Sequence, residues 1–258
     1  MVNPGSETKL YGLIGKPLSH SFSAEYFARK FRAENIRDCR YHLFELEGLS
    51  DLDDLIRNHQ NLQGLNVTIP YKRPVIKYLD KISPEAMEIG AVNCIKINRN
   101  EKKVTLKGYN TDIYGFEKSI NPLLKPHHHK SLVLGTGGSA KAVAWVLNKY
   151  GIETLFVSRT PHDCNQVRYS ILNEDILSTH LLIVNTTPVG MYPNEGQFPD
   201  IPFEFIGKNH LLFDLVYNPA ETWFLRKGKQ QGASIKNGLE MLQLQAEKSW
   251  EIWNDYKF

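Results

Sequence analysis

Short apolar runs alternate with amphipathic runs along almost the whole chain. Apolar runs of about four to eight residues between turn residues are typical of strands, and apolar positions three and four apart are typical of helices. In the first half the pattern predicts strands at residues 9–14, 41–46, 64–69, 92–97 and 103–107, the last two joined by a turn at 98–101 into a hairpin. Between them it predicts helices at residues 23–34, 49–58, 73–79 and 84–89.

The second half repeats strand and helix more regularly. Its predicted strands, at 131–134, 154–157, 181–185 and 211–216, are continuously apolar, which suits a parallel sheet covered by helices on both faces. The clearest amphipathic helices are predicted at 139–150 and 239–253. The chain is therefore predicted to be an α/β protein, and a change of composition near 121–130 places a domain boundary between about residues 108 and 130.

Composition narrows the class of protein. A net charge of only +3 on 258 residues does not suggest a nucleic-acid binder. The three cysteines, Cys39, Cys94 and Cys164, are odd in number and widely spaced, which fits reduced thiols in the cytoplasm better than a disulfide framework or a zinc site. The histidines at 127–129 are expected in an exposed connector and not around a metal, and no run is long enough for a membrane span.

A glycine-rich turn follows the first strand of the second half. Gly135, Gly137 and Ala140 match the pattern G-x-G-x-x-G/A between an apolar strand and an amphipathic helix. The first glycine allows a tight turn, the second lets the backbone approach a pyrophosphate, and the small third residue lets the helix pack closely on the strand. The turn predicts a dinucleotide site, and so an oxidoreductase that uses a nicotinamide cofactor. The alternative is an ordinary turn between a strand and a helix.

The tip of the next strand distinguishes NAD from NADP. An NAD site usually has an acidic residue there, whereas this chain has Ser158, Arg159 and Thr160. A guanidinium group pairs well with a 2′-phosphate, so the sequence favours NADP. The alternative is that Arg159 is an ordinary solvated arginine.

Polar residues also cluster where strands of the first half are predicted to end. The Ser21 and Ser23 hydroxyls could bind an anion together, or one of them could cap the following helix. Lys72 ends the segment 66–72 and could act as an acid or base in a cleft, or could be a solvated lysine. Asp112 could hold that ammonium group, or could be the N-cap of a helix at 113–118.

Nine segments, taken together and in order, resemble the shikimate dehydrogenase family. They are GKPLSHSFS at 15–23, NVTIPYK at 66–72, GAVN at 90–93, NTD at 110–112, GTGGSA at 135–140, SRT at 158–160, NTTPVGM at 185–191, DLVY at 214–217 with Pro219 and Thr222, and the stretch from Gly238 to Ala246.

The resemblance implies both a fold and an activity. An α/β substrate domain would comprise residues 1–110 and 238–258, and a Rossmann-type NADP-binding domain would comprise residues 111–237, with the last helix returning to the substrate domain. The implied reaction is the reversible NADPH-dependent reduction of 3-dehydroshikimate to shikimate, in chorismate and aromatic amino-acid biosynthesis, without a metal.

Residue roles follow by position from the same resemblance. Ser21 and Ser23 would bind the substrate carboxylate, Lys72 would be the acid/base with Asp112 as its partner, and the other substrate-binding residues would be Thr68, Asn93, Tyr217 and Gln245. The cofactor would be bound by Gly135, Gly137, Gly138, Ser139, Ala140, Ser158, Arg159, Thr160, Thr186, Met191 and Gly238.

The chain departs from the family pattern in places. Ala24 replaces a usual proline, Ser158 replaces a usual asparagine, and residues 161–164 supply no second basic side chain. Thr187 stands in a commonly serine-containing segment, with no consequence that we can assign. The preference for NADP therefore depends mainly on Arg159.

Two alternatives remain open at this point. One is a quinate/shikimate dehydrogenase with relaxed choice of polyol or cofactor. The other is a protein that senses NADP(H) without turnover, which the pair Lys72 and Asp112 disfavours. The expected partners are small molecules, with no nucleic acid or membrane, and the expected state is a monomer or homodimer.

Overall fold

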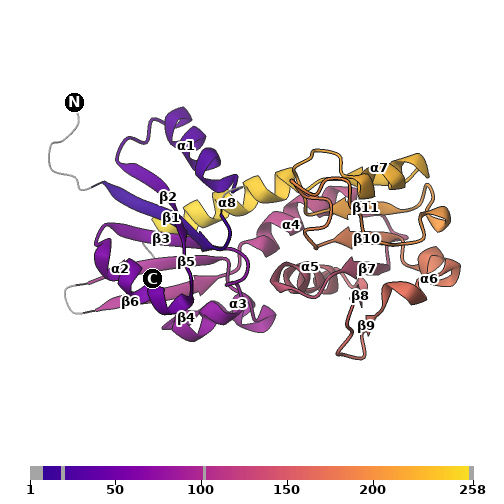
Figure 1. Cartoon of the computed structure of the whole chain (residues 1–258), viewed down its shortest axis with the longest axis horizontal. Coiled ribbons are helices and arrows are strands. Elements are labelled where there is room, and N and C mark those ends of the chain that lie inside the picture. Colours follow the sequence, from indigo (N-terminus) through magenta and orange to yellow (C-terminus); the bar gives the residue numbers. More distant parts are fainter. Residues whose placement is uncertain (1–7, 19–20, 101–102, 256–258) are drawn as a thin grey trace. The chain divides into compact units, whose positions relative to one another are not determined.

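The computed structural model describes residues 8–18, 21–100 and 103–255 (Figure 1). The chain forms two compact units, unit 1 from residues 1–111 and 246–258 and unit 2 from residues 112–245. Ser19 and His20 of the first family segment, and position 101 of the predicted hairpin turn, lie outside the described residues.

Unit 1 is built on a mixed sheet in the order β2-β1-β3-β5-β6-β4. β1 runs parallel to β2 and β3, whereas β5 runs antiparallel to β3 and β6, so the predicted hairpin is confirmed. The strands are β1 (Lys9–Gly15), β2 (Cys39–Glu45), β3 (Leu62–Val67), β4 (Lys81–Ile82), β5 (Cys94–Arg99) and β6 (Val104–Tyr109), and the helices are α1 (Ser23–Ala33), α2 (Leu52–Asn58), α3 (Pro84–Ile89) and the 3₁₀ segments η1 (Leu49–Asp51) and η2 (Pro74–Tyr78).

Helices cover both faces of the unit 1 sheet. Aliphatic residues of α2, η2 and α3 pack on one face, and aromatic residues of α1 and of the end of α8 (Leu239–Asn254) pack on the other (Figure 1). Trp253 stacks on Tyr11 with ring centroids 4.9 Å apart, and its Nε1 donates to the Ile95 carbonyl at 3.0 Å. A Cβ on Gly64 would lie 2.3 Å from the Trp253 ring, so the indole fills the space that this glycine leaves.

Unit 2 is built on a wholly parallel sheet in the order β12-β11-β10-β7-β8-β9. This confirms the parallel sheet that the apolar strands predicted. The strands are β7 (Lys130–Leu134), β8 (Glu153–Val157), β9 (Gln166–Val167), β10 (Leu182–Asn185), β11 (Leu211–Asp214) and β12 (Ser234–Lys236). The helices are α4 (Asp112–Ile120), α5 (Gly138–Lys149), α6 (Glu174–Thr179), α7 (Trp223–Gln230) and the first part of α8, with 3₁₀ segments η3 (Asn121–Leu123), η4 (Tyr169–Ile171) and η5 (Phe203–Phe205).

The strand order of unit 2 reverses at its centre. From β7 the chain moves outward through β8 to β9, and then returns to pair β10 on the other side of β7 before continuing to β11 and β12. In such doubly wound sheets a ligand binds outside the carboxyl ends of the strands, where the order reverses. The ends of β7 and β10 therefore mark the expected binding edge of unit 2.

The structure differs from the predicted elements in a few places. Residues 73–79 were predicted as an ordinary helix, but only Pro74–Tyr78 is helical, as a 3₁₀ turn too short to develop α-helical bonding. Asp112 is the first residue of α4 and not a residue before the helix. His128 is buried and not exposed, because its Nδ1 accepts from the Lys125 N–H at 3.0 Å and its Nε2 lies 3.3 Å from the Asn209 carbonyl.

Neither a metal-binding cluster nor a membrane-spanning helix is found among the described residues. Across residues 8–18, 21–100 and 103–255, no three histidine, cysteine or acidic side chains are grouped so that they could hold a metal ion. In the same part of the chain, no helix combines the length and the apolarity that a membrane span requires.

Candidate active site

Backbone hydrogen bonds gather three of the predicted residues at one edge of the unit 1 sheet. Thr68 follows β3, and its N–H donates to the Ile14 carbonyl of β1 at 2.9 Å. Asn93 precedes β5, and its carbonyl accepts from the Val67 N–H at 2.8 Å. The Lys72 carbonyl accepts from the Val92 N–H at 2.7 Å, which fixes the turn carrying Lys72 beside Asn93.

A chain of hydrogen-bonded polar side chains, half-buried at Tyr41 and buried from Asn66 onward, supports this edge. The Tyr41 hydroxyl donates to Asn66 Oδ1 at 2.9 Å, and Asn66 Nδ2 donates to Ser249 Oγ at 2.9 Å. The Ser249 hydroxyl lies 3.2 Å from Thr111 Oγ1, and the Thr111 N–H donates to Asn93 Oδ1 at 2.6 Å. Because buried polar groups are costly unless paired, this chain holds the Asn93 amide in one orientation.

The sequence did not reveal Tyr41 or Ser249 as members of this group. Ser249 is fully buried on the apolar face of the last helix, between Ala246 and Trp253. A small hydroxyl residue at a core position of an amphipathic helix was the one signal available. Tyr41 carried no such signal, because an aromatic residue in a strand is ordinary.

The serine pair lies where the chain enters α1, with Ser21 in the loop after β1 and Ser23 as the first residue of the helix. Ser21 Oγ accepts from the Ser23 N–H at 3.3 Å and closes a short turn there. Phe22 is the residue before α1, and no side chain of the described residues caps this helix start. Burial raises the pKa of Tyr41, and a hydrogen bond with Ser23 opposes that rise, so Ser23 also contacts the buried polar chain.

In unit 2 the glycine turn has the geometry that its pattern predicts. Gly135 has φ of +106°, and a Cβ there would lie 2.9 Å from Thr186 Oγ1, so the position excludes other residues. Gly137 precedes α5, where no side chain of the described residues caps the helix, and a Cβ on Gly137 would meet open space. The N-terminus of α5 is therefore accessible to a phosphate group, and these residues fit a dinucleotide.

Side chains at the ends of β10 and β11 support the same edge. Thr186 Oγ1 donates to the Leu134 carbonyl at 2.6 Å and so joins the end of β10 to the glycine turn. Asn185 Oδ1 accepts from the Thr187 hydroxyl at 2.7 Å, and Asn185 Nδ2 donates to Asp214 at 2.9 Å. These bonds fix the loops on both sides of the point where the strand order reverses.

The segment after β8 carries the predicted determinants of NADP. Ser158 Oγ accepts from the Thr160 N–H at 3.2 Å, which bends the chain around Arg159. The Arg159 side chain is exposed at the carboxyl edge of the sheet. Both observations fit a guanidinium group presented to a ligand at this edge.

The remaining predicted residues of unit 2 lie on α4, α8 and the loops after β10 and β11. A Cβ on Gly115 would lie 2.5 Å from the Met241 carbonyl and 3.1 Å from the Gln245 Cβ, so α4 and α8 cross closely. Asp112 lies one turn before Gly115 on the same face of α4, which places Asp112 and Gln245 on one pair of packed helices.

Packing alone explains the glycine at position 238. A Cβ on Gly238 would lie 2.1 Å from the Leu215 carbonyl, and its N–H donates to the Val216 carbonyl at 3.1 Å. Met191 is exposed in the loop after β10, and Tyr217 follows β11. The cofactor and substrate roles of these three residues stay predictions.

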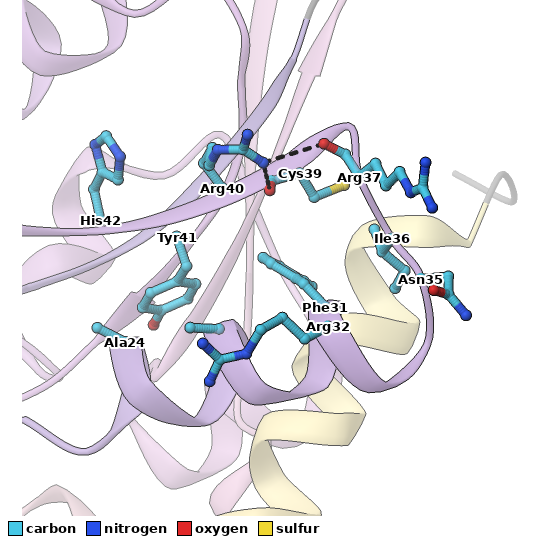
Figure 2. Close-up of a pocket in the computed structure, with 11 residues that line it drawn as sticks. Ala24, Phe31, Arg32, Asn35, Ile36, Arg37, Cys39, Arg40, Tyr41 and His42 are labelled. Carbon is cyan, nitrogen blue, oxygen red and sulfur yellow. Dashed lines mark hydrogen bonds between the residues drawn. The ribbon is translucent and has the colours of Figure 1, made fainter. Parts of the chain in front are cut away.

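A hollow of about 460 Å³ in unit 1 lies between α1 and β2, and Tyr41 is among the residues that line it (Figure 2). None of the predicted site residues is among the described residues that line it. Figure 2 shows the Arg32 and Arg37 side chains pointing in different directions, and Arg40 Nη1 donates to the carbonyls of Arg37 and Cys39. The arginines therefore do not converge on one ligand position.

Comparison with known proteins identifies relatives along the whole chain. The family model described as the shikimate dehydrogenase substrate binding domain matches residues 13–95, all within unit 1. A shikimate dehydrogenase (NADP(+)) from Clostridium beijerinckii is 39% identical, over 96% of this chain and 92% of that protein.

Solved structures agree with this relationship. Shikimate dehydrogenase 1 from Peptoclostridium difficile is 40% identical with a TM-score of 0.82, over 97% of this chain and 93% of that one. Shikimate 5-dehydrogenase from Thermus thermophilus, solved in complex with NADP(H) and shikimate, is 30% identical with a TM-score of 0.81, over 95% of this chain and 93% of that one.

Proposed function

The chain belongs to the shikimate dehydrogenase family, and from this premise we propose that it is an NADP-dependent shikimate dehydrogenase. It reversibly reduces 3-dehydroshikimate to shikimate, a step of chorismate and aromatic amino-acid biosynthesis. The observation that carries the proposal for this chain is the arrangement of Thr68, Lys72 and Asn93, which backbone hydrogen bonds gather at one edge of the unit 1 sheet.

Reduction of a ketone requires a hydride at carbon and a proton at oxygen. Bound NADPH supplies the hydride chemistry. The Lys72 ammonium group stabilises the developing alkoxide and donates its proton to that oxygen, and Asp112 holds the ammonium group in place. General acid catalysis of this kind contributes roughly 10²–10⁴-fold to a rate.

The other side chains bind and orient the substrate. The Ser21 and Ser23 hydroxyls donate to its carboxylate, since the two residues lie two positions apart at the start of α1. Thr68, Asn93 and Gln245 bond the ring hydroxyls, and Tyr217 contacts the ring. Hydroxyl and amide groups suit a polyol because they both donate and accept hydrogen bonds.

The glycine turn and its neighbours bind the cofactor. The backbone from Gly135 to Ala140 receives the pyrophosphate at the start of α5, whose accessible N-terminus favours negative charge. Ser158, Arg159 and Thr160 bind the 2′-phosphate side, Thr186 supports the turn, and Met191 and Gly238 lie near the nicotinamide.

We also propose a role for each of two domains. Residues 1–110 and 238–258 serve as the substrate domain, and residues 111–237 serve as the NADP-binding domain. The protein works in the cytoplasm, which the three unpaired cysteines support, and it does so as a monomer or homodimer.

A matrix of two substrates and two cofactors tests the function. Purified protein is mixed with shikimate or quinate and with NADP⁺ or NAD⁺, and cofactor reduction is followed at 340 nm. We expect the highest kcat/KM for shikimate with NADP⁺. Comparable turnover of quinate would instead indicate a quinate/shikimate dehydrogenase. Tight NADP⁺ binding without reduction in any mixture would contradict the proposal in favour of a sensor.

A further inference from the structure

A second arginine lies at the carboxyl edge of unit 2, on the strand next to β8. β9 (Gln166–Val167) is the edge strand and runs parallel to β8, with Val157 paired to Val167. The Ser158 N–H donates to the Val167 carbonyl at 2.8 Å, so the pairing continues past the end of both strands. Arg168, the residue after Val167, therefore lies beside the segment of Ser158 and Arg159.

The alternation of side chains gives the direction of Arg168. Val157 and Val167 pack on the sheet face that carries α6 and α7, whereas Phe156 packs on the face that carries α5. Because neighbouring strand residues point to opposite faces, and Arg168 has extended backbone angles, Ser158 and Arg168 face the side of α5. This is the side on which the accessible N-terminus of α5 lies.

The acidic residue of the intervening loop does not neutralise these arginines. Asp163 accepts from Gln166 Nε2 at 2.6 Å, and its carbonyl accepts from the Gln166 N–H at 3.1 Å, so it turns back onto the start of β9. Both Arg159 and Arg168 are exposed, and neither forms an ion pair within the described part of the chain. Both guanidinium groups are therefore available to an anion that reaches this edge of the sheet.

We propose that Arg168 binds the 2′-phosphate of NADP together with Arg159 and is a second determinant of cofactor choice. This inference rests on the proposed function, because it assumes a dinucleotide on the glycine turn. Arg168 would then supply the second basic side chain of the phosphate site, which residues 161–164 do not supply because they contain no lysine or arginine. A guanidinium group suits this position because its planar donors match phosphate oxygens.

Binding of two nucleotides to the full chain tests the inference. 2′,5′-ADP carries the 2′-phosphate and ADP lacks it, and calorimetry gives the Kd of each without turnover. Arg168→Ala is expected to raise the Kd of 2′,5′-ADP about tenfold and to leave the Kd of ADP within about twofold. Arg168→Lys should recover part of the loss. Arg226→Ala, which removes an exposed arginine of α7 in the same unit, should change neither Kd.

The outcomes separate the two proposals. If the unaltered protein binds 2′,5′-ADP more tightly than ADP but Arg168→Ala weakens both equally or neither, the role of Arg168 is wrong and the NADP site stands. If the unaltered protein shows no preference for 2′,5′-ADP, both the NADP assignment and the role of Arg168 are wrong. Combining Arg168→Ala with Arg159→Ala adds a check, because residues that bind one phosphate should show non-additive losses.

Discussion

Asp214 should make the stability of the protein fall as the pH rises. Its side chain is fully buried at the end of β11. One carboxylate oxygen accepts from Asn185 Nδ2 at 2.9 Å and from the Val216 N–H at 3.0 Å, and the other accepts from Thr222 Oγ1 at 2.6 Å. Burial raises the pKa of Asp214 from 3.8 to about 6, although these hydrogen bonds oppose the rise.

The size and sign of the effect follow from this shift. A carboxyl group with a pKa near 3.8 when unfolded and about 6 when folded binds its proton more tightly in the folded state. Protonation of Asp214 therefore contributes to the unfolding free energy. This contribution is fully present below pH 3.8 and is lost as the pH rises through about 6. A shift of about two pKa units corresponds to about 3 kcal/mol of unfolding free energy.

Asp214→Asn tests this reasoning because an amide keeps the shape of the carboxyl group and cannot ionise. Urea unfolding of both proteins from pH 4 to 8, followed by circular dichroism, gives the unfolding free energy as a function of pH. Between pH 4 and pH 7, the unfolding free energy of the variant should rise relative to that of the unaltered protein by up to about 3 kcal/mol. Asp163→Asn, at an exposed acid of the same unit, serves as the control and should show no such gain. If the unfolding free energies of Asp214→Asn and of the unaltered protein changed with pH in the same way, the proposed effect of Asp214 would be wrong.

Three further changes test individual parts of the structure. Gly135→Ala places a Cβ at φ +106° and should destabilise the protein by about 2 kcal/mol in thermal unfolding, whereas Gly137→Ala should leave the Tm unchanged but weaken NADP⁺ binding in a titration. Tyr41→Phe removes the donor to the buried Asn66 carbonyl oxygen and should cost about 1–3 kcal/mol in urea unfolding. Lys72→Ala should lower kcat by roughly 10²–10⁴-fold while NADP⁺ still binds, and a near-normal kcat would remove its proposed role.

The regular part of the fold was predictable because its elements bury whole apolar runs. β7, the glycine turn and α5 follow directly from that pattern. β9 was not predictable, since Gln166 and Val167 are only two residues and carry no periodicity. α7 was missed because three basic residues interrupt its apolar positions.

The candidate site divides in a similar way. Positions such as Lys72 and Asn93 could be predicted because each belongs to a segment that resembles a family. The buried chain through Tyr41, Asn66 and Ser249 could not be predicted, because its hydrogen bonds join residues up to 183 positions apart. Such contacts depend on how the elements pack and leave only weak traces in local sequence.

The division of α8 between the two units has a consequence for synthesis. Unit 2 is one continuous stretch, residues 112–245, so all of it can leave the ribosome and fold before Ala246 appears. Unit 1 begins earlier but lacks Ser249 and Trp253, which complete its polar chain and fill the space beside Gly64. The part of the chain that is made first is thus completed last. Until the whole of unit 2 has been translated, α1 alone covers the aromatic face of the unit 1 sheet, and the area that α8 will cover stays exposed.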